Sequence, residues 1–245
     1  FFYGDYKVSN RISGGTCDGW FQATHVPSGH PVLLQFFSGT VTQDAAAWTA
    51  LKNRVNGRID VVHPQLHRCF EIAELDNFKF MVSEELTGKS AQESVAEKGS
   101  LPFEEACRIV RLTALALAEV HASREPHAEI RPGHIWLLAN DDVKLVRQMA
   151  KPIATPTVED ADQQLALQAD YLAPEFVETG QLPGPSTDIY ALGCTLYELL
   201  TGQPPFPGGA VTDKLQRHAT EPIGPLKSAG VPGKLEEALT FMMAK

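Results

Sequence analysis

The stretch S-T-D-I-Y-A-L-G-C-T-L-Y-E-L-L, Ser186 to Leu200, predicts the helix around which the rest of the chain packs. It is preceded by the segment D-Y-L-A-P-E, Asp170 to Glu175. A serine or threonine at the start of the first stretch can cap a helix, and Gly202 followed by prolines can end it. Apolar residues lie on nearly every face of this helix, at Ile189, Leu192, Leu196, Leu199 and Leu200. A helix of this kind is buried on all sides, so other elements must pack around it.

Both motifs resemble those of the protein kinase family, specifically the eukaryotic-like (Hanks-type) Ser/Thr kinases of bacteria. In that family A-P-E ends the activation segment, and the helix after it is the pillar of the larger lobe. The resemblance implies that Asp188 ties this helix to the catalytic loop. It also implies an α+β fold with a small β-rich lobe, residues 1–85, and a larger, mainly helical lobe, residues 86–245. We expect the larger lobe to be truncated before its final helix.

Length and composition agree with two lobes. The 245 residues are 43% hydrophobic, enough to bury a substantial core, and the net charge of −9 argues against a nucleic-acid partner. Four cysteines without a C-x-x-C pair favour a reduced, cytoplasmic setting. No apolar run could span a bilayer, and the sequence does not begin with Met. We therefore expect a domain of a longer protein, with any membrane anchor outside this chain.

Periodicity and breakers predict the order of the elements. Three strands are expected between Tyr6 and Phe37. The remaining elements are a helix at 44–59, a strand at 78–86, a six-turn helix at 101–122, a strand at 143–146, and helices at 211–218 and from 233 to the end.

The segment I-S-G-G-T-C-D-G-W-F-Q-A, Ile12 to Ala23, resembles a kinase glycine loop. Glycines let backbone N–H groups approach phosphates, but the three positions here are Ser13, Gly15 and Asp18, of which one is glycine. A carboxylate at Asp18 would repel a phosphate. An ordinary tight hairpin turn is the alternative interpretation.

Two charged positions of the family are changed in the N-terminal part. The resemblance places Gln35 where kinases have the Lys that neutralises the phosphates, and Arg54 where they have its Glu partner. Losing both suggests that the ion pair was abandoned as a unit. An equal alternative is that the helix at 44–59 carries Lys52, Arg54 and Arg58 as ordinary exposed residues.

The segment H-A-E-I-R-P-G-H-I-W-L, His127 to Leu137, matches the frame of the catalytic loop H-R-D-L-K-P-x-N-I-x-L. Its packing residues are retained. At the chemical positions, Glu129 replaces the catalytic Asp, Arg131 the Lys and His134 the metal-binding Asn. Glu129 could still accept a proton, but a shift of about 1 Å in such a group can cost on the order of a hundredfold in rate.

The metal-binding Asp of D-F-G is replaced by Arg147. A guanidinium repels a cation, and the imidazole of His134 suits Mg²⁺ poorly because that ion demands oxygen ligands. We therefore expect no metal site. We also predict that Arg147 supplies the local positive charge in its place and pairs with Glu129.

The adenine slot of kinases has small walls, and Trp20 and Leu33 stand at those positions here. Together they could fill the slot, beside the hinge residues Glu84 and Leu86, so we expect no bound ATP and no other cofactor. The alternative is that the Trp20 side chain turns outward and leaves the slot open.

A pseudokinase is predicted, that is, a protein without phosphotransfer activity that acts as a scaffold or allosteric regulator in signalling. Five replacements together carry this prediction: Gln35, Arg54, Glu129, His134 and Arg147. Its expected partners are other proteins, such as an active kinase or a phosphopeptide-binding domain. One alternative is a weak or atypical Ser/Thr kinase that uses Glu129. Another is a nucleotide or anion sensor that uses Arg54, Arg131 and Arg147. Thr155 and Thr157, in the polar segment before A-P-E, are candidate phosphorylation sites or plain loop residues.

Overall fold

The structure is a computed structural model that describes residues 2–12, 20–37, 44–75, 78–123, 126–147, 166, 168–175, 184–226 and 231–245. Several predictions from the sequence lie outside these ranges. They concern the glycine-loop positions Ser13, Gly15 and Asp18 and the candidate phosphorylation sites Thr155 and Thr157.

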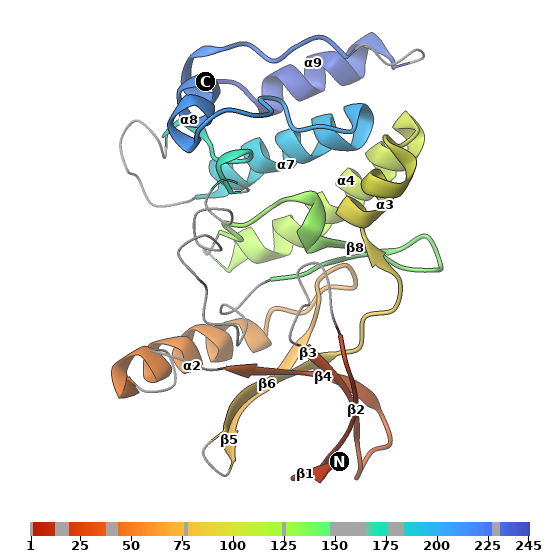
Figure 1. The fold of residues 1–245 in the computed structure, drawn as a ribbon, viewed down its shortest axis with the longest axis vertical. Helices are drawn as coiled ribbons and strands as arrows, with labels where there is room; N and C mark the ends of the chain where they lie inside the picture. Colours follow the sequence, from red (N-terminus) through yellow and green to blue (C-terminus); the bar gives the residue numbers. More distant parts are fainter. Residues whose placement is uncertain are drawn as a thin grey trace.

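One end of the molecule is a curled antiparallel sheet (Figure 1). Its strand order is β1-β2-β3-β4-β6-β5. The strands are β1 (Phe2–Tyr3), β2 (Tyr6–Arg11), β3 (Trp20–His25), β4 (Pro31–Phe37), β5 (Cys69–Leu75) and β6 (Phe78–Glu84). The three strands predicted up to Phe37 are confirmed, and β1 is an addition, since two residues carry too little pattern to be recognised.

Strand register decides which side chains face the rest of the protein. Trp20 on β3 lies opposite Gln35 on β4, which lies opposite Met81 on β6, and Leu33 lies opposite Ser83. Because cross-strand partners point to the same face, these residues share one side of the sheet.

Helix α2 (Ala45–Ile59) covers this inner face. The Asp44 carboxylate caps its N-terminus by accepting from the backbone N–H groups of Ala46 and Ala47. Its buried residues Trp48, Leu51 and Val55 belong to the same cluster as Trp20 and Leu33.

The other end is helical (Figure 1). It contains α3 (Ala91–Lys98), α4 (Phe103–Ala122), the 3₁₀ turn η2 (Pro132–His134), α7 (Pro185–Thr201), α8 (Val211–Thr220) and α9 (Gly233–Met242). A small sheet of β7 (Lys89–Ser90), β8 (Ile135–Leu137) and β9 (Val143–Leu145) lies next to it. In the part of the chain that the structure describes, no helix is long and apolar enough to cross a membrane.

Helix α7 is the central pillar, as its sequence predicts. Eleven of its residues are buried, including Leu192, Leu196 and Leu199, and α4 and α9 pack against it. Gly202 ends it with φ 83°, and a Cβ there would lie 2.0 Å from the carbonyl oxygen of Gly99, so only glycine fits. The expected cap is corrected: the N-cap is Gly184, whose N–H donates to the Thr187 hydroxyl at 3.0 Å.

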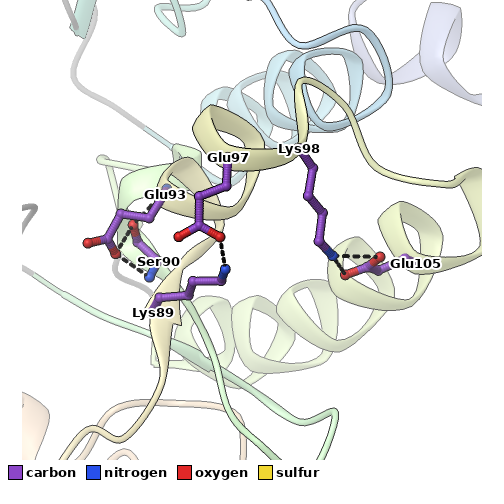
Figure 2. Close-up of polar contacts among 6 residues, drawn as sticks. All are labelled: Lys89, Ser90, Glu93, Glu97, Lys98 and Glu105. Atoms are coloured by element: carbon purple, nitrogen blue, oxygen red, sulfur yellow. Dashed lines mark hydrogen bonds and ion pairs between the residues drawn. The ribbon is translucent and has the colours of Figure 1, made fainter.

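The chain passes from the sheet to the helices through residues 85–88 and enters α3 through a capping box. The Ser90 hydroxyl accepts from the Glu93 N–H at 3.1 Å, while the Glu93 carboxylate accepts from the Ser90 N–H at 2.7 Å (Figure 2). Figure 2 also shows Lys89 paired with Glu97 and Lys98 with Glu105. These contacts fix where the helical region begins.

Candidate functional site

The catalytic-loop segment is anchored to α7 by one buried carboxylate. Asp188 accepts from the backbone N–H groups of His127 and Ala128, each at 2.7 Å, and its carboxylate lies 2.8 Å from His121 Nε2. Asp188 itself is almost completely buried. The tie between α7 and the catalytic loop that the resemblance implies is therefore confirmed.

The start of the loop is strained and apolar. Ala128 has φ 68°, in the left-handed region that costs a non-glycine residue of order 1 kcal/mol or more. His127 is buried, and burial, followed by the charge of Arg147, holds the pKa of its imidazole well below the usual range. His127 is therefore neutral and acts as a packing residue.

Glu129 stands at the edge of a cavity of about 180 Å³ between the loop, the D-Y-L-A-P-E segment and α7. The lining includes Glu129, Arg131, His134, Gln168, Tyr171 and Thr187. The Glu129 side chain is half-buried, so it has access to this cavity. The lining of this cavity therefore contains a carboxylate, that of Glu129, and a guanidinium, that of Arg131.

Both ring nitrogens of His134 are engaged. Nδ1 is bonded to the carbonyl oxygen of Glu129, and Nε2 lies 3.3 Å from Arg131 Nε and 3.1 Å from Arg131 Nη2. Since Arg131 can only donate, Nε2 is the acceptor and the ring is neutral. Burial, reinforced by the Arg131 charge, lowers the pKa of His134 to about 3.

These residues do not fit Mg²⁺, the ion that kinases use. The metal-ligand position of the loop is a neutral imidazole whose free lone pair already faces a guanidinium. The second position is Arg147, whose Nη2 donates to the carbonyl oxygen of Pro126 at 2.6 Å. Among the described residues, no group of three His, Cys, Asp or Glu side chains could hold a metal ion. The pairing of Arg147 with Glu129 stays a prediction.

The two positions where kinases have the Lys–Glu ion pair differ in solvent exposure. Gln35 is 1% exposed and lies on β4 beside Trp20, whereas Arg54 is exposed on α2. The α2 cation whose charge reaches the catalytic loop is Arg58, since it contributes to lowering the pKa of His127. The sequence predicted Arg58 only as an exposed residue of this helix, one turn beyond Arg54, whereas it is partly buried. The arginines of the sensor interpretation also have separate environments: Arg131 contacts His134, and Arg147 contacts Pro126.

The adenine-slot positions lie inside the core. Trp20 and Leu33 both have 0% exposure, so the alternative in which the Trp20 side chain turns outward is wrong. Their cluster also contains Leu86 from the hinge and Trp136 from β8. This cluster joins the inner face of the sheet to the helical region.

Sequence reasoning missed two residues near Trp20: Trp136, which belongs to this cluster, and His67, whose ring lies beside that of Trp20. Trp136 occupies position x of the I-x-L motif, where any residue is allowed. A large aromatic residue at this position was the one sign in the sequence that its side chain is buried. His67 follows the dipeptide His63-Pro64, and its ring centroid lies 5.5 Å from that of Trp20 with the planes at 30°. Nothing in the sequence places His67 beside Trp20, because the contact spans 47 residues.

The D-Y-L-A-P-E segment is held by buried polar pairs. Asp170 pairs with Lys214 at 2.7 Å, and the Tyr171 hydroxyl donates to the Glu198 carboxylate. Burial raises the pKa of Glu198. These contacts fix the far wall of the cavity.

The sequence model of the protein kinase domain matches residues 15–237. The chain belongs to the protein kinase family. This kinase domain is 25% identical to serine/threonine-protein kinase PrkC of Bacillus subtilis over 99% of the chain and 38% of the relative. It is 26% identical to PknB of Mycobacterium leprae and to PknL of Mycobacterium tuberculosis, over 98% of the chain in both comparisons.

The kinase domain spans about 40% of the length of PknB and 60% of PknL. The resemblance to bacterial Hanks-type Ser/Thr kinases and the two-lobed α+β fold are confirmed. The expectation that the chain is not an enzyme is corrected, because the family and these relatives are protein kinases. That expectation rested only on the replacement of individual catalytic and metal-binding side chains.

Proposed function

We propose that the chain is an atypical bacterial Ser/Thr-protein kinase domain in which Glu129 is the proton acceptor. The observation that carries this proposal is the position of Glu129. Its side chain lines the cavity, and Asp188 holds the backbone of the loop on which Glu129 lies by accepting two hydrogen bonds from that loop. The family and its Ser/Thr kinase relatives support the same reaction class.

The reaction uses a nucleoside triphosphate and a protein hydroxyl as substrates. The Ser or Thr oxygen forms a bond to the γ-phosphorus, the bond from that phosphorus to the leaving diphosphate breaks, and the hydroxyl proton passes to the Glu129 carboxylate. Arg131 lies on the same cavity and can stabilise negative charge that develops there. No step is assigned to a metal ion, because the residues at its positions do not fit one.

This chemistry is slow for two physical reasons. Gln35 carries no charge with which to neutralise phosphates, and the extra methylene of Glu129 moves the carboxylate relative to an Asp. Misplacement of one positioned group by about 1 Å costs on the order of a hundredfold in rate. We therefore expect turnover at least a hundredfold below that of a relative with the full set of charged groups.

The test is phosphoryl transfer from γ-labelled ATP to a Ser/Thr-rich acceptor protein, with purified wild type and Glu129→Gln. Wild type should label the acceptor slowly. The labelling rate of Glu129→Gln should be at least tenfold lower than that of wild type, as expected after removal of a proton acceptor. The matched control is Glu237→Gln, an exposed carboxylate on α9, which should leave the rate unchanged. Equal labelling by wild type and Glu129→Gln would refute the role of Glu129.

A second candidate function is regulation of other proteins through direct contact, favoured by the way Trp20, Leu33 and Trp136 fill the adenine slot. In this role the kinase domain acts as a scaffold or allosteric partner of an active kinase or a phosphopeptide-binding domain. Co-purification of wild type with an active bacterial Ser/Thr kinase, lost on Arg131→Ala but not on the exposed Arg54→Ala, tests it. Retention by both variants would exclude the cavity as the contact surface.

A further inference from the structure

The imidazole of His67 has the two kinds of contact that hold a flat base in a slot. One face lies toward the Trp20 ring, with centroids 5.5 Å apart. At its edge, Nε2 lies 3.0 Å from the carbonyl oxygen of the hinge residue Glu84. A carbonyl oxygen only accepts, so Nε2 carries the hydrogen and donates it.

The Glu84 carbonyl is held in place by the rest of its residue. The Glu84 backbone N–H donates to the Arg68 carbonyl at 2.9 Å, and its Oε1 accepts from the Arg68 N–H at 2.7 Å. Lys144 on β9 donates to both carboxylate oxygens, at 2.8 and 2.9 Å. The acceptor is therefore fixed by contacts from both ends of the molecule.

His67 is fixed on its backbone side as well. Its N–H donates to the Leu145 carbonyl at 2.9 Å, and Leu145 donates in turn to Gln65 at 2.7 Å. The ring is 8% exposed. The planar imidazole of His67 thus lies beside the Trp20 ring and donates a hydrogen bond from its edge to the Glu84 carbonyl oxygen.

We infer that His67 is a specificity-determining residue of the nucleotide site, because its imidazole takes the hinge carbonyl that a purine amino group would otherwise use. A base can then reach the Glu84 oxygen only after the imidazole has moved away. Wild type should gain nothing from a purine 6-amino group, and binding should depend on the phosphates and ribose. This inference rests on the proposed function, since it names the determinant of the phosphoryl donor.

The test compares the binding of ATP and ITP, which differ in the group at the purine 6-position, by wild type and His67→Val. Binding is measured by thermal melting without an acceptor protein, so it is independent of phosphoryl transfer. We expect His67→Val to bind ATP at least tenfold more tightly than wild type. We also expect it to prefer ATP over ITP by roughly fivefold to tenfold, the value of one net hydrogen bond.

His67→Phe is the matched control, since it keeps a ring against Trp20 but no donor. It should bind ATP as weakly as wild type, because a ring still fills the space. The inference is overturned if His67→Val gains no affinity for ATP, or if wild type itself prefers ATP over ITP. Should His67→Val fail to fold, His67→Ala, which also removes the imidazole, takes its place in the same comparison.

If His67→Val binds ATP tightly but transfers no phosphate, the inference stands and the proposed role of Glu129 fails. If wild type transfers phosphate and prefers ATP over ITP, the proposed function stands and the inference fails. The two hypotheses are therefore separable.

Discussion

Trp20→Val should open the nucleotide slot at a measurable cost in stability. The Trp20 side chain is completely buried between β3, α2 and β8. Truncating a buried Trp to Ala costs about 3–5 kcal/mol of unfolding free energy. Trp20 Nε1 finds no hydrogen-bond partner among the described residues, so its removal also relieves an unsatisfied donor. We therefore expect the low end, about 3 kcal/mol.

For a domain of this size, about 1 kcal/mol corresponds to roughly 2–4 °C in melting temperature, so Trp20→Val should melt about 6–12 °C below wild type. ATP should recover part of this loss. A ligand at a hundred times its dissociation constant adds about 2.7 kcal/mol, or roughly 5–11 °C. The assay is a melting series with increasing ATP, with and without Mg²⁺ or Mn²⁺.

The control uses two neighbouring leucines on opposite faces of β4. Leu33 and Leu34 are both completely buried, and Leu33 belongs to the Trp20 cluster while Leu34 packs on the outer face. Each substitution by alanine should cost about 2–5 kcal/mol, but only Leu33→Ala should gain an ATP response. A saturable shift of wild type at sub-millimolar ATP, or equal responses of the two alanine variants, would refute the occupied slot.

Three further predictions concern the scaffold of the site. Asp188→Asn should lower the free energy of unfolding by about 3 kcal/mol, measured by urea denaturation, because an amide cannot accept from both loop N–H groups as the carboxylate does. Since burial lowers the pKa of His134 to about 3, the folded state resists its protonation, and stability should fall as the pH drops below about 6.5. His134→Asn should reduce that slope in denaturation curves taken between about pH 4 and 7. Lys144→Met should lower the melting temperature by a few degrees, about 1–2 kcal/mol, by leaving the partly buried Glu84 carboxylate without this partner; an unchanged melting temperature would mean that solvent replaces Lys144.

The frame of this kinase domain could be predicted from local sequence patterns alone. The apolar residues of 186–200 required a buried helix, because a polar surface was missing on nearly every side. The frame of the catalytic loop and the A-P-E motif then placed the catalytic-loop segment against this helix. These are local patterns, so they could be read without coordinates.

Sequence also located the replaced chemical groups, since each is a substitution at a fixed offset from a packing residue. It did not determine their consequence. Whether His134 could bind a metal depended on which neighbour took its second nitrogen, and Arg131 takes it only in the folded loop. The conclusion that the chain is not an enzyme was wrong for a related reason, because single substitutions do not define the activity of a family member.

The surroundings of Trp20 depend on the tertiary structure and could not be predicted from the sequence. His67 precedes β5, Glu84 ends β6 and Trp136 lies on β8, and their meeting with Trp20 depends on sheet register and side-chain rotamers. The same applies to Arg58, whose charge reaches His127 across the interior. Contacts between residues far apart in the chain leave no periodic signal, and for that physical reason the sequence could not reveal them.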